Sequence, residues 1–201
     1  MSGLGGSVSL LQTDIPYDGG LIQVTDGYFT LPQSLSQTIL QKQLTTFLDL
    51  INKFNLTATW ENTPFVTIFV PTNDAFNSSK LTGSEPGFKE FLLSHIVVDK
   101  DMVGYLPNLH NGQTLETKSH LRQKVEIRGS DYFIGDLGAK IVRSQMNIGL
   151  TNGVAHVVDK VLTMPTATVT TAAASDLSTA AGATVAVILA ALAGLLLSSN
   201  F

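Results

Sequence analysis

The sequence contains no cysteine. This absence excludes disulfide bonds and thiolate metal sites, and it leaves the redox compartment of the protein open. Positive charge is also scarce, because 12 Lys and Arg stand against 16 Asp and Glu and give a formal net charge of −4. No block of Lys or Arg occurs along the chain. A surface that attracts nucleic acid needs such a block, so no nucleic-acid partner is expected.

The sequence does contain enough apolar material for one packed domain. Hydrophobic residues make up 44% of the 201 residues, and domains cluster near about 100–150 residues. Apolar residues at i, i+4 and i+7 spacing predict one long helix over residues 34–54, and a second helix is predicted over residues 85–95. The apolar face of the long helix consists of Leu40, Leu44, Phe47, Leu48, Ile51 and Phe54.

Short apolar runs separated by Gly, Asn or Asp predict strands. One is predicted over residues 21–31, within a region of turns, and one over residues 67–70. The others follow Gly112: they cover residues 115–117, 124–127, 132–134, 139–142 and 154–162, and RGSDY forms a hairpin turn between two of them. Helices that come first and a meander of strands that follows predict an α+β fold. The last strand is apolar on both faces, which favours a central position in its sheet.

His95 and His156 invite an enzymatic interpretation, with Asp74 or Asp159 as the partner and a serine nearby. The sequence contains no Gly-x-Ser-x-Gly nucleophile elbow, and a triad is defined by geometry. The alternative, which we favour, is that both histidines are buried and donate hydrogen bonds to backbone carbonyls. The four histidines have no metal-ligand spacing, so no metal site and no cofactor are expected.

One strand-like pattern occurs twice. GLIQVTDGYFTLP covers residues 20–32 and GVAHVVDKVLTMP covers residues 153–165, at a constant offset of 153 − 20 = 133 residues. Glycine, valine, aspartate, threonine and proline fall at matching places. Such a period indicates a repeated structural unit.

Three segments carry a resemblance to the fasciclin domain family. TIFVPTNDAF (residues 67–76) is similar to the first signature of the family, FLLSHIV (residues 91–97) to its central segment, and NGVAHVVDKVL (residues 152–162) to its second signature. The signature positions are Thr67, Phe69, Pro71, Thr72, Asn73, Asp74, Ala75, Phe76, His95, Asn152, Gly153, His156, Val157 and Asp159.

The signature residues also have a local physical interpretation. Pro71 ends a strand because it cannot donate to a ladder, and Thr72 or Asn73 can then cap a helix. Phe69 and Phe76 are expected in the core. Asn152 and Gly153 are expected to form a turn in which both residues tolerate a positive φ.

The resemblance implies a fasciclin-type fold in which N-terminal helices pack on a wedge of short strands. It places one fasciclin domain at residues 33–165. Because a fasciclin domain spans about one 133-residue period, residues 1–32 are interpreted as the last strand of a preceding fasciclin domain in a longer tandem protein. Such a strand would lack its own sheet and would be poorly packed. A start inside a tandem protein would also account for an N-terminus without the basic region and apolar run of a secretory signal.

The family role implied by the resemblance is a non-enzymatic extracellular module for adhesion or for organisation of the cell surface, cell wall or matrix. Its partners would be surface or matrix proteins and polysaccharides. The integrin-binding features of animal members are not carried over, because Ser94 replaces the usual tyrosine and Asn147-Ile148 replaces an Asp-Ile pair. The alternative is a soluble or vacuolar protein that binds a small apolar or lipid ligand between its helices and sheet.

Two N-glycosylation sequons are present, at Asn55 and Asn77. Asn55 follows a predicted helix and is the better acceptor, whereas Asn77 is expected to be shielded within the turn that Phe76 anchors.

Residues 166–179 are rich in Thr, Ala and Ser and are interpreted as a stalk, and residues 180–201 form a hydrophobic tail. Small residues, a weakly polar spacer and a terminal apolar run are the three parts of a GPI signal, with Ala173, Ala174 and Ser175 as candidate attachment residues. A membrane-anchored protein at the cell surface is therefore expected, held by a C-terminal lipid anchor or, alternatively, by a single membrane span.

Overall fold

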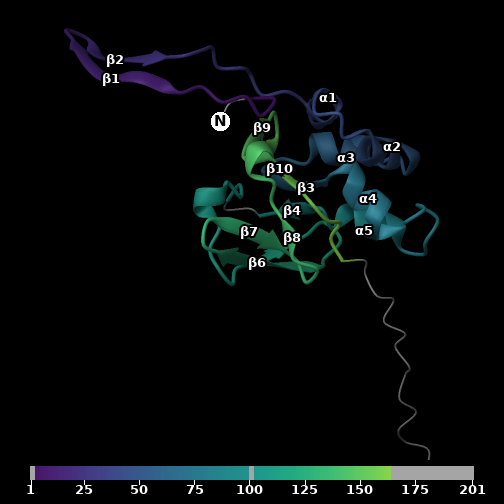
Figure 1. Cartoon of the computed structure of the whole chain (residues 1–201). Coiled ribbons are helices and arrows are strands. Elements are labelled where there is room, and N and C mark those ends of the chain that lie inside the picture. Colours follow the sequence, from purple (N-terminus) through teal and green to yellow (C-terminus); the bar gives the residue numbers. More distant parts are fainter. Residues whose placement is uncertain (1–2, 100–101, 164–201) are drawn as a thin grey trace, which may run out of the picture. The chain divides into compact units, whose positions relative to one another are not determined.

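The computed structural model describes residues 3–99 and 102–163 (Figure 1). Its helices are α1 (Leu35–Gln41), α2 (Thr45–Lys53), α3 (Thr57–Asn62), α4 (Asn73–Ser79) and α5 (Phe88–Leu93), with short 3₁₀ turns η1 (Leu106–Asn108) and η2 (Arg143–Gln145). Its strands are β1 (Leu10–Tyr17), β2 (Gly20–Thr25), β3 (Val66–Pro71), β4 (Ile96–Val98), β5 (Thr114–Glu116), β6 (Arg122–Arg128), β7 (Asp131–Ile134), β8 (Ala139–Lys140), β9 (Ile148–Leu150) and β10 (Gly153–Val158). The predicted α+β class is confirmed.

The centre of the fold is a four-stranded sheet with the order β4-β3-β10-β9. Strands β3 and β10 are parallel neighbours, from Val66 opposite Gly153 to Pro71 opposite Val158. All residues of β3, and all of β10 after Gly153, are buried, as the apolar pattern on both faces of the last strand predicted. A strand buried on both faces is typical of the middle of a layered domain.

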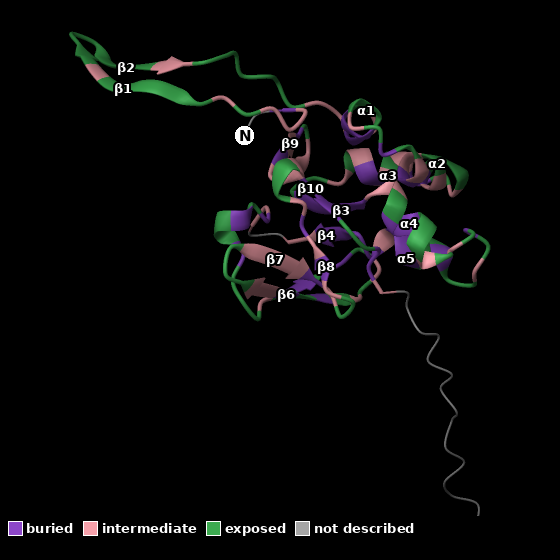
Figure 2. Ribbon diagram, viewed as in Figure 1, coloured by how far each residue is buried: buried purple, intermediate pink, exposed green. Residues whose placement is uncertain are grey.

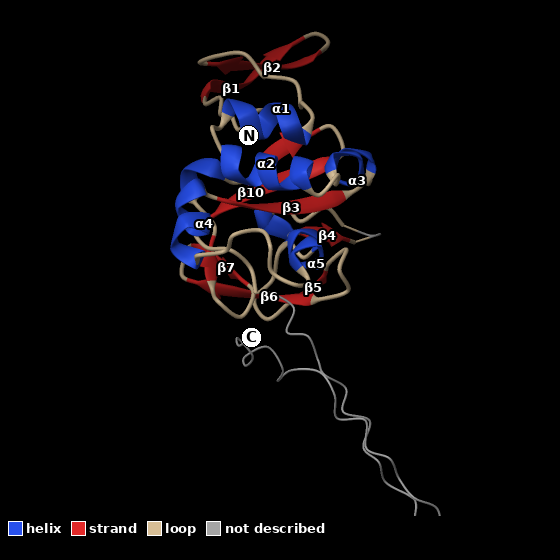
Figure 3. Ribbon diagram, turned by 90° about the vertical axis from the view of Figure 1, so that its right-hand side faces the viewer, coloured by secondary structure: helices blue, strands red, loops and turns tan. Residues whose placement is uncertain are grey.

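Two hydrophobic clusters lie on the two faces of this sheet. Ile68 and Val70 of β3 join Ala155 and Val157 of β10 in the cluster that includes the side chains of α1 to α5. Phe69 and Val158 point to the other face, where they meet Leu115, Val125 and Ile134 of the second sheet, β5-β6-β7-β8. Figure 3 shows α1 and α2 on one side of β3 and β10 and the second sheet on the other. The order of layers is therefore helices, central sheet, outer sheet.

The outer sheet is the predicted meander. Strands β5 to β8 are antiparallel to their neighbours, and Arg128 lies opposite Asp131 across a two-residue turn. Gly129 in this turn has a φ of 62°, which a residue without Cβ adopts at little cost. The hairpin predicted from RGSDY is confirmed.

The single helix predicted over residues 34–54 is wrong. The chain forms α1 and α2, and the backbone turns between them at Gln43, whose φ is 58°. Leu40, placed on the apolar face by the prediction, is 62% exposed. The cause is a contact from a distant part of the sequence, because the side-chain amide of Asn73 binds the backbone on both sides of the break, as described below.

The N-terminal region also differs from the prediction. A hairpin of two antiparallel strands, β1 and β2, replaces the single strand predicted over residues 21–31. Strand β2 ends at Thr25. In the segment that follows, the Thr30 carbonyl accepts from the Gly3 N–H at 2.9 Å, and Gln33 bridges to Leu150 of β9. Figure 2 shows most of the hairpin in green, the colour of exposed residues.

The predicted stalk and tail, residues 166–179 and 180–201, lie outside the described residues, and so do Ala173, Ala174 and Ser175. Within residues 3–99 and 102–163, no helix has the length and apolar character needed to cross a membrane.

Candidate functional site

The first signature forms the junction between β3 and α4. Thr72 caps the helix: its Oγ1 accepts a hydrogen bond from the Ala75 N–H at 3.1 Å, and its own N–H donates to the Val158 carbonyl at 3.0 Å. The predicted cap is confirmed, and the same residue fastens the end of β10. Of the helix residues that follow, Ala75 and Phe76 are buried and Asp74 is exposed in the first turn.

Asn73 connects this junction to the break between α1 and α2. Its Oδ1 accepts from the Thr46 N–H at 3.1 Å, and its Nδ2 donates to the Gln43 carbonyl at 2.8 Å. Both backbone groups lie where a continuous helix would have satisfied them internally. The side chain thus replaces helical hydrogen bonds that are lost at the turn.

Asn152 and Gly153 start β10 and tie it to α3 and β3. The Nδ2 of Asn152 donates to the carbonyls of Trp60 and Thr63, both at 2.8 Å. A Cβ on Gly153 would lie 2.0 Å from the Val66 carbonyl oxygen. The predicted turn is present, but neither residue has a positive φ. Glycine is required here because β3 approaches closely, and the conformational reason given by the sequence analysis is wrong.

His156 lies in the middle of β10 and is fully buried. Its Nε2 donates to the Gly104 carbonyl at 2.9 Å, and its Nδ1 accepts from the Asn147 N–H at 3.2 Å. Gly104 is held in turn by its N–H, which donates to the Thr67 Oγ1 at 2.7 Å. Burial lowers the pKa of His156 to about 4, so the ring is neutral at neutral pH and its tautomer is fixed by its two partners.

His95 is the counterpart of His156 on the helical side of the sheet. Its Nδ1 donates to the Phe91 carbonyl at 2.9 Å, and its Nε2 accepts from the Leu162 N–H at 3.2 Å. The rings of Phe47 and Phe91 pack on it, with centroids 5.8 and 4.9 Å away. Burial lowers the pKa of His95 to about 4, so this ring is also neutral.

The catalytic arrangement considered for the two histidines is not assembled. Both nitrogens of each ring are engaged by backbone groups. The Oδ1 of Asp159 accepts from the Lys140 N–H at 2.8 Å and binds no histidine. Phe69 stacks on His156, and Val157 belongs to the helical cluster. The polar side chains of Thr72, Asn73, His95, Asn152, His156 and Asp159 therefore hold backbone segments together.

The two glycosylation candidates, Asn55 and Asn77, differ less in exposure than predicted. Asn55 is exposed immediately after α2 and has a φ of 53°, in agreement with its predicted place beyond a helix end. Asn77 is exposed on α4. The prediction that Asn77 is shielded is wrong, because Ala75 and Phe76 face the core and Asn77 does not.

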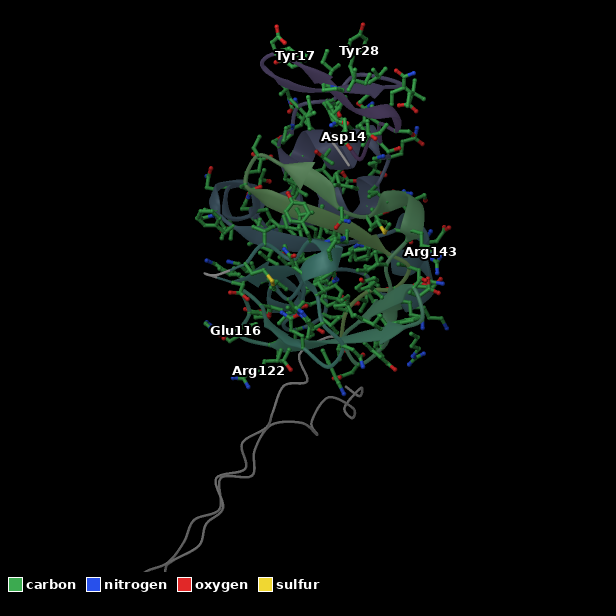
Figure 4. All side chains as sticks on the ribbon, turned by 90° about the vertical axis from the view of Figure 1, so that its left-hand side faces the viewer. Asp14, Tyr17, Tyr28, Glu116, Arg122 and Arg143 are labelled. Carbon is green, nitrogen blue, oxygen red and sulfur yellow. The ribbon has the colours of Figure 1, made fainter. Side chains whose placement is uncertain are left out.

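The N-terminal hairpin and the segment after it carry a concentration of exposed apolar side chains, in agreement with the poor packing predicted for this region. These residues are Leu10, Leu11, Tyr17, Leu21, Ile22, Tyr28, Phe29 and Leu31. Tyr28 is 96% exposed, and Figure 4 shows Tyr17 and Tyr28 pointing away from the rest of the ribbon. The signal was present in the sequence, because residues 1–41 combine these apolar residues with acids and contain no Lys or Arg.

A second surface feature is a mostly apolar cleft of about 460 Å³. It lies between α4, the turn at Leu137 and the segment that follows β10. Its walls are formed by Ala75, Ser78, Ser79, Leu81, Leu137 and residues 159–162.

Comparison with known proteins agrees with this architecture. A family model described as the fasciclin domain matches residues 42–165. This match covers more than half of the chain, and the chain belongs to the fasciclin domain family.

Two relatives are named fasciclin-like arabinogalactan proteins. The chain is 33% identical over 168 residues to the fasciclin-like arabinogalactan protein CTB11 of Cercospora beticola, covering 80% of this chain and 42% of the relative. It is 28% identical over 163 residues to the fasciclin-like arabinogalactan protein elcF of Phaeosphaeria nodorum, covering 80% of this chain and 50% of the relative. The chain therefore spans half or less of the length of these two proteins.

A solved structure shares the fold. The FAS1 domain pair of the insect cell adhesion molecule fasciclin I superposes with a TM-score of 0.54 at 20% sequence identity, over 81% of this chain and 62% of that one.

Proposed function

We propose that this protein is a non-enzymatic, extracellular interaction module that acts at the cell surface, cell wall or matrix. The observation that carries the proposal is the use of the signature side chains. Thr67, Asn73, Asn152, His95 and His156 all bind backbone groups, which supports a scaffolding role for the signature. The names of the fungal relatives, fasciclin-like arabinogalactan proteins, support an extracellular place.

The partners proposed for this module are surface or matrix proteins and polysaccharides. Exposed apolar and tyrosine side chains are enriched where proteins meet partners, and the N-terminal hairpin provides them. Glycosylation at Asn55 and Asn77 fits this setting, since both side chains are exposed. We further propose that residues 166–179 act as a stalk and that the chain is linked to a GPI anchor at Ala173, Ala174 or Ser175 after removal of the apolar tail.

The anchor is tested in a eukaryotic host cell, with the chain placed behind a secretion signal. Treatment of intact cells with phosphatidylinositol-specific phospholipase C is expected to release the domain into the medium. A variant that ends at Thr179 is expected to enter the medium without the enzyme. Retention after treatment, with a C-terminal epitope tag that survives maturation, would show a membrane span in place of the lipid anchor.

The interaction role is tested with the secreted domain and isolated cell wall or matrix of the producing cells. Binding that is lost when Tyr17 and Tyr28 are both changed to Ser would support the hairpin as a contact surface. The matched control changes Tyr105 and Tyr132, which lie in the folded body, to Phe. Equal binding by both variants would remove the hairpin from the proposal.

The alternative, a binding protein for a small apolar or lipid ligand, is favoured by one observation, the cleft beside α4. Its volume of about 460 Å³ lies within the range of small-molecule sites. A dansyl-labelled fatty acid would show enhanced fluorescence with the bacterially produced chain, and Ser78→Trp would fill the cleft and abolish the signal. Asn77→Trp, on the same helix but outside the cleft, is the control.

A further inference from the structure

The β1–β2 hairpin repeats the β9–β10 hairpin in register. Tyr17 lies opposite Gly20, and Ile15 opposite Ile22. Leu150 lies opposite Gly153, and Ile148 opposite Ala155. Each residue of the first set is 133 positions before its counterpart, so the offset found in the sequence also holds for the backbone pairing. In a hairpin the register is fixed by the turn, and both hairpins turn through two residues at places that are 133 positions apart.

The open ends of the two hairpins are closed in the same way. The Asp159 N–H donates to the Lys140 carbonyl at 3.0 Å, and its Oδ1 accepts from the Lys140 N–H at 2.8 Å. The Asp26 N–H donates to the Ser9 carbonyl at 3.1 Å, and its Oδ1 accepts from the Ser9 N–H at 2.8 Å. This reciprocal pair of hydrogen bonds marks the end of each unit.

The two units differ in length only in the segment that leads from the closing residue, Ser9 or Lys140, to the hairpin turn. Ser9 and Asp26 are 26 − 9 = 17 positions apart, whereas Lys140 and Asp159 are 159 − 140 = 19 apart. The second unit contains the 3₁₀ turn η2 (Arg143–Gln145), and the first contains two register shifts in β1 instead. A change of two residues at a bulge leaves both ends of a hairpin in place.

The two hairpins have different neighbours. Strand β10 pairs with β9 on one edge and with β3, in parallel, on the other. Among the described residues, β2 pairs only with β1. Leu21 is 59% exposed, whereas its counterpart Val154 is buried. After the strands, Tyr28 and Phe29 are exposed where Val161 and Leu162 are buried.

We propose that β2 is the equivalent of β10 in a second fasciclin unit, and that its open edge receives a parallel strand of the β3 type from a fasciclin body on its N-terminal side. The partner is thus a body that carries helices and a strand like VTIFVP, which would pair with residues 20–25 and cover Leu21, Tyr28 and Phe29. The relatives fit this partner, because the chain spans only 42% and 50% of their lengths. An uncovered edge with apolar faces is otherwise a site of aggregation.

The experiment supplies such a body from this chain itself. A second copy of residues 34–139 replaces residues 1–8. Its last residue, Ala139, then directly precedes Ser9, in the same way as Ala139 of the natural domain precedes Lys140. Two signals are measured against the natural chain: amide hydrogen exchange at Ile22 to Thr25, and nitration of Tyr28 by tetranitromethane. We expect exchange to slow at least 100-fold and Tyr28 to become protected.

Two further variants make the result decisive. Leu21→Asp in the fusion should abolish both effects, as a charge cannot replace the buried counterpart Val154. A second fusion carries Gln23→His, Tyr28→Val and Phe29→Leu, which gives the hairpin the same side chains as residues 156, 161 and 162. Its exchange should be slowed even if the native hairpin side chains fit the supplied body poorly. Fast exchange in both fusions would overturn the proposal. Protection that grows with concentration in the natural chain would also overturn it, because the occupant would then be a second copy.

Discussion

Residues 9–29 and residues 140–162 show what one sequence pattern becomes in two surroundings. Both form a hairpin with the same register and the same closing aspartate. In residues 140–162, strand β10 lies between β3 and β9 and is buried. In residues 9–29, most of the apolar side chains are exposed. The strand pairing is therefore local, whereas burial depends on the neighbouring strand and its layers. An isolated hairpin is only marginally stable in water, so the two units should differ widely in stability.

The largest expected effect comes from placing a charge at matched positions of the two strands. Val154→Asp buries an unpaired carboxylate in the central sheet, and it should destabilise the domain by more than about 4 kcal/mol, enough to unfold it. Leu21→Asp, at the equivalent exposed position, should change stability by less than about 0.5 kcal/mol. Urea unfolding followed by circular dichroism checks both. A large loss for Leu21→Asp would show that the hairpin is already packed in the isolated chain.

The next effect is a dependence of stability on pH. Burial lowers the pKa of His95 and of His156 to about 4 in the folded protein. In the unfolded chain their pKa is near 6.5, so as the pH falls the unfolded chain binds these protons before the folded protein does. The contribution of the two neutral histidines to the free energy of unfolding is complete above pH 6.5 and is lost as the pH falls from 6.5 to 4. From pH 7 to pH 5 the loss should be about 2 kcal/mol for each histidine.

This pH dependence distinguishes the two strands, because Gln23 stands where β10 has His156. His156→Gln makes β10 match β2 at this position and should remove about half of the loss between pH 7 and 5. His156→Ala should in addition lower stability by about 1–3 kcal/mol at pH 7, since the Gly104 carbonyl loses its donor. An unchanged melting temperature together with loss of a measurable catalytic activity would instead support an enzyme.

A smaller difference is expected at the residues that follow the two strands. Leu162 is 1% exposed, and Leu162→Ala should cost about 3 kcal/mol through the cavity it leaves. Phe29, its counterpart, is 71% exposed, and Phe29→Ala should be nearly neutral in the natural chain. In the fusion with a duplicated body, Phe29→Ala should become destabilising. Melting temperatures of the two parent proteins, the natural chain and the fusion, and of the three variants measure this directly.

Much of the fold could be predicted from the sequence because it rests on local patterns. The buried strands β3 and β10, the outer meander and the cap at Thr72 follow from periodicity and turn residues. The break between α1 and α2 could not, since it depends on Asn73, which binds the Gln43 carbonyl from 30 positions along the chain. Strands β4 and β9, of three residues each, were also not predicted.

The candidate site was predicted unevenly. The histidines were expected to donate to backbone carbonyls, and each donates to one. The acceptor bonds from Leu162 and Asn147 could not be anticipated, because they depend on loops that sequence patterns do not place. Strand β1 was missed because Asp14 and Pro16 disfavour a strand locally. Its pairing with β2 has a register shift between Gln12 and Ile15, the interval that contains Asp14.

Residue-resolved amide hydrogen exchange of the natural chain tests most directly whether the neighbouring strand, and not the local pattern, stabilises the repeated hairpin. Matched amides are compared: Ala155, His156, Val157 and Val158 of β10 against Ile22, Gln23, Val24 and Thr25 of β2. The β10 amides should exchange only on global unfolding, and the β2 amides should exchange at least about 1,000-fold faster. Equal protection of the two sets would contradict the account, because the hairpin would then be stable without the strand that completes it.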